Sequence, residues 1–471
     1  MARRIQGAAT SAILTLLFGS GSASARPNIL FILADDVGAE AFGRYGGTSY
    51  STPRIDTLAD QGVRFTHAYA TPLCTPSRVQ LLTGQYNFRN YESFGWLSPS
   101  ETTFAQVLRD AGYRTAIAGK WQLSRPFTAD VDEGEPRAPD ITPAIMRDSY
   151  GFDEYSLWQL NYRDYHNRYW RPKIDQNGNY QTYGWDDYGP DIYTAFLTNF
   201  MAQAVSDDVP FLAYYTMCLP HDPWVPTPDS TSGRSRTNHH TANFPDNIAY
   251  LDKLVGRLLD QLDALGIRDN TLVIFTSDNG TDPRITSQTT SGPVTGDKGA
   301  GTEYGTHVPF IADWGTNLAP SVSGRIVDFT DIFPTFLSVS GIPAPEGLLL
   351  DGKPLFGPDG AAGEDRTIAY LWYDCMKPGF ETAEWARDSQ YKLYVDGSFF
   401  DVSATPPERS GDNIPVGTGS PEAEAARVKL QAVLDYYASE QNGDNDPVLP
   451  AGAGESRASM KNSGRQAQLK K

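Results

Sequence analysis

The chain has 471 residues and a formal net charge of -18, from 57 acidic and 39 basic side chains. Its 40% hydrophobic and 20% charged residues are typical of a globular protein, which excludes disorder as the dominant state. The length allows about two or three domains. A chain this acidic is repelled by a phosphate backbone, so we expect no nucleic-acid partner, and any anionic ligand must meet a local basic site.

The first 25 residues have the pattern of a secretory signal peptide. Arg3 and Arg4 precede an apolar run at residues 8–18, and residues 23–25 form a small-residue cleavage site. The run is shorter than the roughly 20 residues that span a bilayer, and we expect no membrane span further along the chain. The sequence therefore predicts a secreted or periplasmic protein. An odd number of cysteines, three, argues against a disulfide scaffold.

From residue 28 onward, short apolar runs alternate with helical patterns. This alternation is typical of an α/β fold, in which helices cover both faces of a mostly parallel sheet. Buried strands are expected at residues 29–33, 115–118, 211–215, 272–276 and 310–312. Helices are expected at residues 102–111 and 248–265, and the second has the clearest apolar face in the chain.

The C-terminal part predicts a second, smaller domain. A stretch rich in glycine and proline at residues 341–358 indicates a junction. Beyond it, strands are expected at residues 367–372, 391–395 and 398–402, and a helix at residues 423–439. The apolar face of that helix would consist of Val428, Leu430, Val433, Leu434 and Tyr437. The predicted units are a catalytic domain at residues 26–345, an α+β domain (an antiparallel sheet plus a helix) at residues 346–442, and a mobile tail at residues 443–471.

Polar side chains follow four of the predicted strands. They are Asp35 and Asp36, Lys120, His221, and Asp278 with Asn279. In open α/β sheets, ligands bind at the carboxyl ends of the strands, so these groups are expected to converge on one site. At any single strand, a turn or a helix cap would explain an Asp or an Asn equally well. Four strands together favour a functional site.

The most specific motif is Cys74-Thr75-Pro76-Ser77-Arg78, followed by Leu82-Thr83-Gly84. It resembles the C-x-P-x-R motif of type I sulfatases, whose cysteine is oxidised to formylglycine, an aldehyde with a nucleophilic hydrate. The resemblance runs from Arg26 to about Glu408 and takes in the four strand ends and Lys298, in the family's order. It implies a bacterial arylsulfatase with an alkaline-phosphatase-like fold, and a maturation enzyme that generates formylglycine at Cys74.

An all-oxygen set of side chains predicts a metal site. Asp35, Asp36, Asp278 and Asn279 suit a hard cation, which we expect to be Ca²⁺ ahead of Mg²⁺ or Mn²⁺. Without a cation, the three carboxylates would repel one another. The resemblance adds Cys74 to the ligand set, because the metal would orient the hydrate at that position.

The resemblance also implies roles for four basic residues. Lys120 and Lys298 would hold sulfate oxygens, and Arg78 would hydrogen-bond to the modified residue. His221 would protonate the leaving alcohol. Taken alone, each lysine also fits a solvated surface charge, and His221 also fits a Pro-His turn at a strand end.

Two positions depart from the family pattern. Gln122 stands where many sulfatases have a histidine, and glutamine cannot act as a base. His307 ends a segment, Glu303-Tyr304-Gly305-Thr306-His307, in which many relatives have an arginine. His307 would either replace the missing base or pack as a structural histidine under the following strand, and we favour the structural interpretation. Both Gln122 and His307 are kept as candidate substrate contacts.

Residues 162–173 are the densest mixture of basic and aromatic side chains. Here Arg168 and Arg171 are candidate contacts for an anionic glycan, with aromatic faces stacking on sugar rings. Equally, the aromatic rings could pack on the sheet and leave the charges in water. The expected function is release of sulfate from a sulfated carbohydrate or an aryl sulfate. The alternatives are a phosphonate or phosphodiester hydrolase of related fold, and a catalytically silent binder of sulfated glycans, which Gln122 motivates.

Overall fold

The computed structural model describes residues 26–443 apart from residues 125–139, 162–167, 234, 377–378, 404–407 and 409–410. The predicted signal peptide, the predicted tail beyond residue 443 and half of the basic and aromatic segment therefore lie outside the described residues. Within the described part of the chain, no helix combines the length and the apolar character that crossing a lipid bilayer requires.

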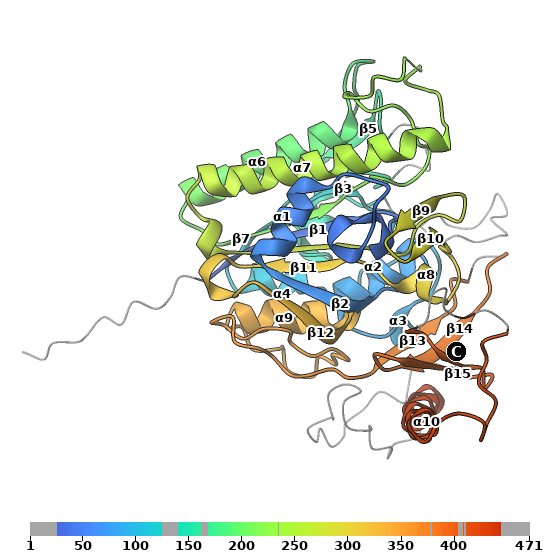
Figure 1. The fold of residues 1–471 in the computed structure, drawn as a ribbon. Helices are drawn as coiled ribbons and strands as arrows, with labels where there is room; N and C mark the ends of the chain where they lie inside the picture. The colour runs from blue at the N-terminus through green and yellow to red at the C-terminus, as the bar shows by residue number, and fades with distance from the viewer. Residues whose placement is uncertain are drawn as a thin grey trace, which may run out of the picture.

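A sheet of ten strands occupies the centre of the molecule (Figure 1). Its strands are β1 (Asn28–Ala34), β2 (Val63–Tyr69), β3 (Arg114–Lys120), β4 (Glu154–Trp158), β5 (Lys173–Gln176), β6 (Asn179–Thr182), β7 (Phe211–Thr216), β8 (Thr271–Ser277), β11 (Phe310–Asp313) and β12 (Ser321–Asp328). They lie in the order β12-β2-β11-β8-β1-β7-β3-β4-β5-β6. The five neighbours from β8 to β4 are all parallel, which confirms the predicted α/β class.

One predicted strand is antiparallel, which agrees with a mostly parallel sheet. β11, which covers the run at residues 310–312, is antiparallel to both β8 and β2. Between β8 and β11 the chain forms a hairpin, β9 (Thr286–Thr289) with β10 (Gly292–Thr295), and a short helix, α8 (Glu303–Thr306). A strand parallel to β8 would have to start at the opposite edge of the sheet, which needs a crossover connection. This connection stays at the edge where β8 ends, so β11 starts there and is antiparallel.

Helices cover both faces of the sheet, with α6 and α7 on one face and α4 and α9 on the other (Figure 1). The helices before the C-terminal unit are α1 (Pro53–Gln61), α2 (Cys74–Thr83), α3 (Asn87–Asn90), α4 (Phe104–Asp110), α5 (Pro143–Asp148), α6 (Gly189–Ser206), α7 (Phe244–Ala264) and α9 (Ile332–Val339). Successive side chains of β1 point to opposite faces of the sheet. Ile29 and Phe31 therefore pack in the core under α4 and α9, and Leu30 and Ile32 pack in the core under α6 and α7.

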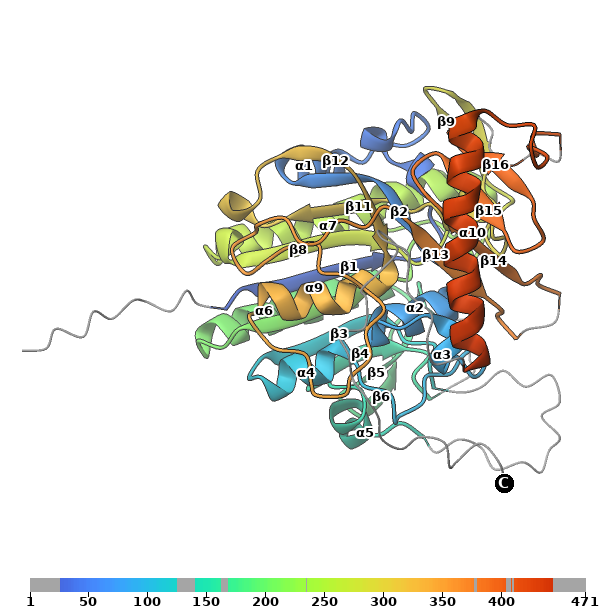
Figure 2. The same ribbon diagram turned by 90° about the horizontal axis from the view of Figure 1, so that it is seen from below.

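The C-terminal unit is an antiparallel sheet of four strands covered by a long helix, as predicted (Figure 2). The elements are β13 (Ala369–Tyr373), β14 (Ala383–Arg387), β15 (Tyr391–Tyr394), β16 (Phe399–Asp401) and α10 (Pro421–Asn442). The sequence did not predict β14. It also placed Val428 wrongly, because Val428 is 72% exposed while Leu430 is buried. Two residues along a helix point to nearly opposite sides, so both cannot face the sheet. The domain boundary at residue 345 stays a prediction.

Candidate active site

The polar groups at the strand ends converge at the carboxyl edge of the parallel sheet. Asp35 and Asp36 follow β1, which lies between β7 and β8, and Lys120 ends β3 on the other side of β7. Ligand atoms of Asp35, Asp36, Cys74 and His221 all lie within 4.8 Å of one another. A spacing this close shows that the strand ends form one site.

Cys74 is the first residue of α2 and lies inside this cluster. All ten residues of α2 are buried, and Cys74 Sγ lies 4.0 Å from Asp36 Oδ1. Burial raises the pKa of the Cys74 thiol to about 11, although Lys120 and Lys298 act in the opposite direction. An unmodified Cys74 is therefore a neutral thiol at neutral pH, and a neutral thiol is a poor nucleophile.

The oxygen donors around Asp36 fit a hard cation. Asn279 Nδ2 donates to Asp36 Oδ1 at 2.9 Å, and the Asp36 backbone N–H donates to Asp278 Oδ1 at 3.1 Å. Asn279 Oδ1 is buried and has no hydrogen-bond partner among the described residues. A buried carbonyl oxygen without a hydrogen-bond donor, next to carboxylates, can serve as a ligand to a cation. Asp35, Asp36, Asp278 and Asn279 therefore fit the expected metal.

Both lysines form ion pairs with the aspartates, Lys120 as a buried and Lys298 as a partly buried side chain. Lys120 is 1% exposed and its Nζ lies 2.7 and 3.0 Å from the two carboxylate oxygens of Asp35. Lys298 Nζ donates to Asp36 Oδ2. The alternative interpretation of solvated surface lysines is therefore wrong. The two ammonium groups point into the cluster, where an anionic ligand would meet them.

Arg78 links helix α2 to the ends of strands β3 and β8. Its Nε and Nη2 donate to Asp278 Oδ2 at 3.1 and 2.8 Å, and its Nη1 donates to the backbone oxygen of Lys120 at 3.2 Å. The structure, which describes both residues, shows no hydrogen bond from Arg78 to Cys74. Since Arg78 lies one helical turn beyond Cys74, this fork instead fixes the first turn of α2 against the ends of β3 and β8.

Burial and ion pairing act in opposite directions on the carboxylates. Burial raises the pKa of Asp35, and the charge of Lys120 offsets this only in part. For Asp36 burial also acts upward, but His221 and Lys298 outweigh it and hold the pKa below its ordinary value. The charges of these aspartates in turn raise the pKa of Lys120 and Lys298 despite their burial. Both lysines are thus cationic at neutral pH.

His221 faces the same carboxylate through Nε2. This nitrogen lies 3.4 Å from Asp36 Oδ2 and 3.5 Å from Lys298 Nζ, whereas Nδ1 lies 2.7 Å from the backbone oxygen of Asp222. A carbonyl only accepts, so Nδ1 carries the proton that binds it and Nε2 is directed into the site. Burial lowers the pKa of His221, and Asp36 opposes that effect. The ring is held with Nε2 toward the site, where Nε2 is an acceptor in the neutral ring and a proton donor only when the ring is doubly protonated.

The two positions that depart from the family pattern lie in different places. Gln122 follows β3 with φ 56, and its Oε1 is buried without a partner among the described residues. His307 Nε2 lies 3.0 Å from the backbone oxygen of Thr66, and its ring is next to Tyr69. These contacts match the structural interpretation of His307.

The basic and aromatic segment divides into a buried and an exposed part. Arg168 is 6% exposed, with its guanidinium 4.4 Å from the ring centre of Trp158. Arg171 is exposed and lies over Trp185, which is itself 60% exposed. The exposed charge of Arg171 fits the packing interpretation, Arg168 is buried, and contact of either arginine with a glycan stays a prediction. Residues 162–167 lie outside the described residues.

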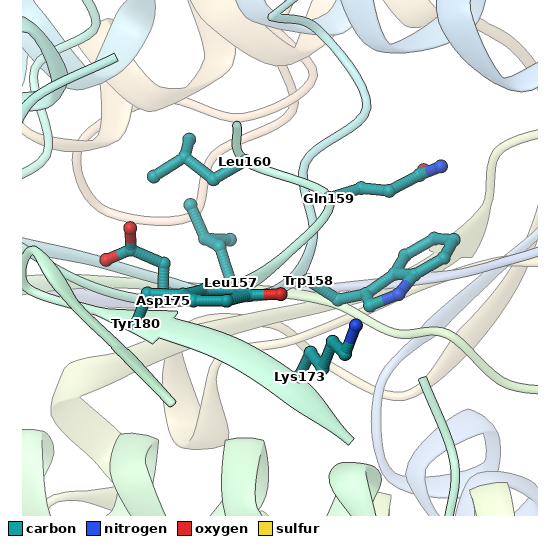
Figure 3. A pocket seen from close by; sticks show the side chains of 7 residues that line it. All are labelled: Leu157, Trp158, Gln159, Leu160, Lys173, Asp175 and Tyr180. Carbon is teal, nitrogen blue, oxygen red and sulfur yellow. The ribbon is translucent and has the colours of Figure 1, made fainter. Parts of the chain in front are cut away.

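Sequence reasoning missed the end of β4. Trp158 ends this strand directly beside Lys120, and Gln159 follows it. They border a small pocket (Figure 3) that is lined by Leu157, Trp158, Gln159, Leu160, Lys173, Asp175 and Tyr180. The rule that strand ends carry the site would have found Trp158 and Gln159, but the run at residues 154–158 is short and was not recognised as a strand.

Comparisons with known proteins agree with this arrangement. The sequence model of the family Sulfatase matches residues 27–342. Human arylsulfatase A is 33% identical over 375 residues, which cover 73% of this chain and 69% of that protein. The ulvan-active sulfatase of Formosa agariphila is 28% identical, covering 90% of this chain and 87% of its own length. The crystal structure of Ps i-CgsB in complex with k-i-k-neocarrahexaose has a similar fold, with a TM-score of 0.70, 23% identity, and coverage of 91% of this chain and 95% of that one.

Proposed function

The chain belongs to the sulfatase family and is a sulfuric ester hydrolase, and from this premise we propose that it releases sulfate from a sulfated carbohydrate by means of formylglycine at position 74. One observation carries the proposal. The cysteine of the C-x-P-x-R motif lies within 4.8 Å of the ligand atoms of Asp35, Asp36 and His221. A nucleophile formed there would stand next to a metal site and a proton donor.

The oxygen donors are proposed to hold Ca²⁺, with Mg²⁺ or Mn²⁺ as the alternatives. Asp35, Asp36, Asp278 and Asn279 would bind it, and the modified residue 74 would complete the set. When present, the cation neutralises charge on the sulfate and formylglycine supplies a hydroxyl nucleophile. A maturation enzyme that oxidises Cys74 is part of the proposal.

Three basic side chains would bind and position the sulfate group. Lys120 and Lys298 would donate to its oxygens, because both ammonium groups already point into the carboxylate cluster and stay charged there. Arg78 would position residue 74 and would not itself bind the sulfate. Its bonds to Asp278 and to the backbone oxygen of Lys120 hold residue 74 against the ends of the strands.

In its doubly protonated form, which the carboxylate of Asp36 at 3.4 Å from Nε2 favours, His221 would give the Nε2 proton to the leaving alcohol. The Nδ1–H bond to the backbone oxygen of Asp222 fixes the ring, and Tyr169 supports the turn by donating to the backbone oxygens of Cys218 and His221. A fixed imidazole directed at the leaving oxygen is the requirement for general acid catalysis.

A glycan substrate is supported by the relatives, which include an ulvan-active sulfatase and a protein crystallised with a carrahexaose. Gln122, Arg168 and Arg171 are the proposed substrate contacts, whereas the contacts of His307 favour its structural interpretation. Secretion or export to the periplasm, directed by residues 1–25, completes the proposal.

The test is mass spectrometry of the tryptic peptide of residues 65–78, from protein produced with a formylglycine-generating enzyme, together with sulfate release from p-nitrophenyl sulfate. We expect an aldehyde at residue 74 and loss of sulfate release in Cys74→Ala. Cys218→Ala is the matched control, because Cys218 is equally buried and its thiol has no proposed role. An unmodified thiol in active protein would overturn the mechanism, and a larger kcat/KM on an aryl phosphodiester would favour the phosphodiesterase alternative.

A further inference from the structure

Arg168 is a buried cation without an anionic partner among the described residues. It is 6% exposed, and its Nε and Nη1 are buried with no hydrogen-bond acceptor in that part of the chain. Its guanidinium lies over the ring of Trp158. Stacking on an aromatic ring accounts for one face of the guanidinium, but it leaves the in-plane N–H groups unsatisfied, and unsatisfied donors are rare in protein interiors.

The position of Arg168 is tied to the active site from two sides. Trp158, on which it stacks, is the register partner of Lys120 at the neighbouring strand end. Tyr169, the next residue along the chain, donates through its hydroxyl to the backbone oxygens of Cys218 and His221. Arg168 therefore lies on the side of the site where His221 would meet the leaving group.

The charges already present in the site do not account for Arg168. Asp35 is paired with Lys120, Asp36 with Lys298, and Asp278 with Arg78. These three carboxylates therefore each have a cation of their own. The structure shows no ion pair for Arg168 within the ranges it describes, and an anionic group of a ligand would supply such a partner.

Two carboxamides follow the paired strand ends that carry Lys120 and Trp158, and they suit the rest of a sugar. Gln122 and Gln159 follow the adjacent strands β3 and β4, both with positive φ (56 and 60), and each has a buried Oε1 without a partner in the described part of the chain. Carbonyl oxygens of this kind accept hydrogen bonds from hydroxyl groups. Acceptors for hydroxyls at the ends of β3 and β4, together with a donor for an anion over Trp158, match a charged carbohydrate better than a plain aryl group.

We propose that Arg168 recognises a second anionic group of the substrate, so that the preferred substrates are sulfate esters whose leaving group carries another sulfate or a carboxylate next to the scissile ester. This inference rests on the proposed function. The flat fork of the guanidinium binds a sulfate or a carboxylate through two parallel N–H groups, and the two sources share that chemistry.

The experiment compares one aryl sulfate without a second charge, p-nitrophenyl sulfate, with two that carry a second anionic group next to the ester, 4-nitrocatechol disulfate and 2-carboxy-4-nitrophenyl sulfate. The proteins are the mature wild type, Arg168→Gln, Arg168→Lys and the control Arg64→Gln. Arg64 also lies over an aromatic ring, that of Tyr45, but at the beginning of β2. Melting temperatures establish that each variant is folded.

We expect Arg168→Gln to lower kcat/KM on the preferred dianion about thirtyfold, about 2 kcal/mol at 1.4 kcal/mol per factor of ten, mainly by raising KM. On p-nitrophenyl sulfate the loss should be less than about threefold, a change of under 1 kcal/mol. Arg168→Lys should restore part of the loss, and Arg64→Gln should behave as wild type. The disulfate and the carboxylate arms show which second anion is preferred.

Equal losses on all three substrates would overturn the inference, since they would assign Arg168 to packing. A wild type with no preference for either dianion would overturn it without any variant. If the wild type hydrolyses none of the three compounds, the proposed function fails and the inference fails with it. Hydrolysis of all three at similar rates would refute the inference alone.

Discussion

A buried ion pair offers the sharpest test of what joins the C-terminal unit to the sheet domain. Arg366 precedes β13, and its Nε and Nη2 bind both carboxylate oxygens of Asp331 at 2.6 to 3.1 Å. The side chains are 1% and 0% exposed. Arg44 and Asp60 form the same two-pronged pair at 50% and 52% exposure. Burial is thus the main difference between the two pairs.

Loss of the buried pair should lower the free energy of unfolding several times more than loss of the exposed pair. Arg366→Met leaves the Asp331 carboxylate buried without its cation, which should lower the free energy of unfolding by about 3–5 kcal/mol. Arg44→Met removes a solvated pair and should cost about 0–1 kcal/mol. The double variant Arg366→Met with Asp331→Asn should recover part of the loss, because the stranded charge is gone while the acceptor oxygen stays.

Urea unfolding followed by tryptophan fluorescence measures these differences. We expect the midpoint of Arg366→Met to fall well below that of Arg44→Met, at an unchanged dependence on urea concentration. A midpoint for Arg366→Met as high as that of Arg44→Met would refute the reasoning. So would a double variant less stable than the single variant, since the cost would then not come from an uncompensated charge.

Two further predictions concern the site itself. Gly119, with φ 108, precedes Lys120, and a Cβ there would lie 1.9 Å from the backbone oxygen of Thr216. Gly119→Ala should therefore cost about 1–3 kcal/mol more in urea unfolding than Gly112→Ala, which has a similar φ of 98 but open space around it. Equal losses of stability in the two variants would show that the positive φ, and not the close contact with Thr216, determines the effect. Chelation should lower the melting temperature of the mature protein. Adding Ca²⁺ at a hundred times its Kd should raise the free energy of unfolding by about 2.7 kcal/mol and restore the melting temperature. Asn279→Ala, which removes one donor, should need more Ca²⁺ for the same recovery. An unchanged melting temperature after chelation would argue against a bound metal.

Local sequence patterns were sufficient to predict the α/β class and the groups that meet in the site. Buried strands appear as apolar runs, and the polar residues that interrupt them mark the strand ends, so the pattern alone brings Asp35, Lys120 and Asp278 together at one edge of the sheet. The order of the motifs along the chain identified the family. These features depend on patterns within a few residues, and such patterns can be read from a sequence.

Strand direction, ion pairing and the roles of individual arginines depend on the tertiary structure. An apolar run is the same in either direction, so the antiparallel β11 could not be foreseen. Arg168 and Arg171 stand three residues apart in one segment, yet one is buried beside the site and the other is exposed. The partner of a side chain is set by residues distant in sequence. Arg168 faces inward because β4 brings Trp158 beneath it, which no local pattern encodes.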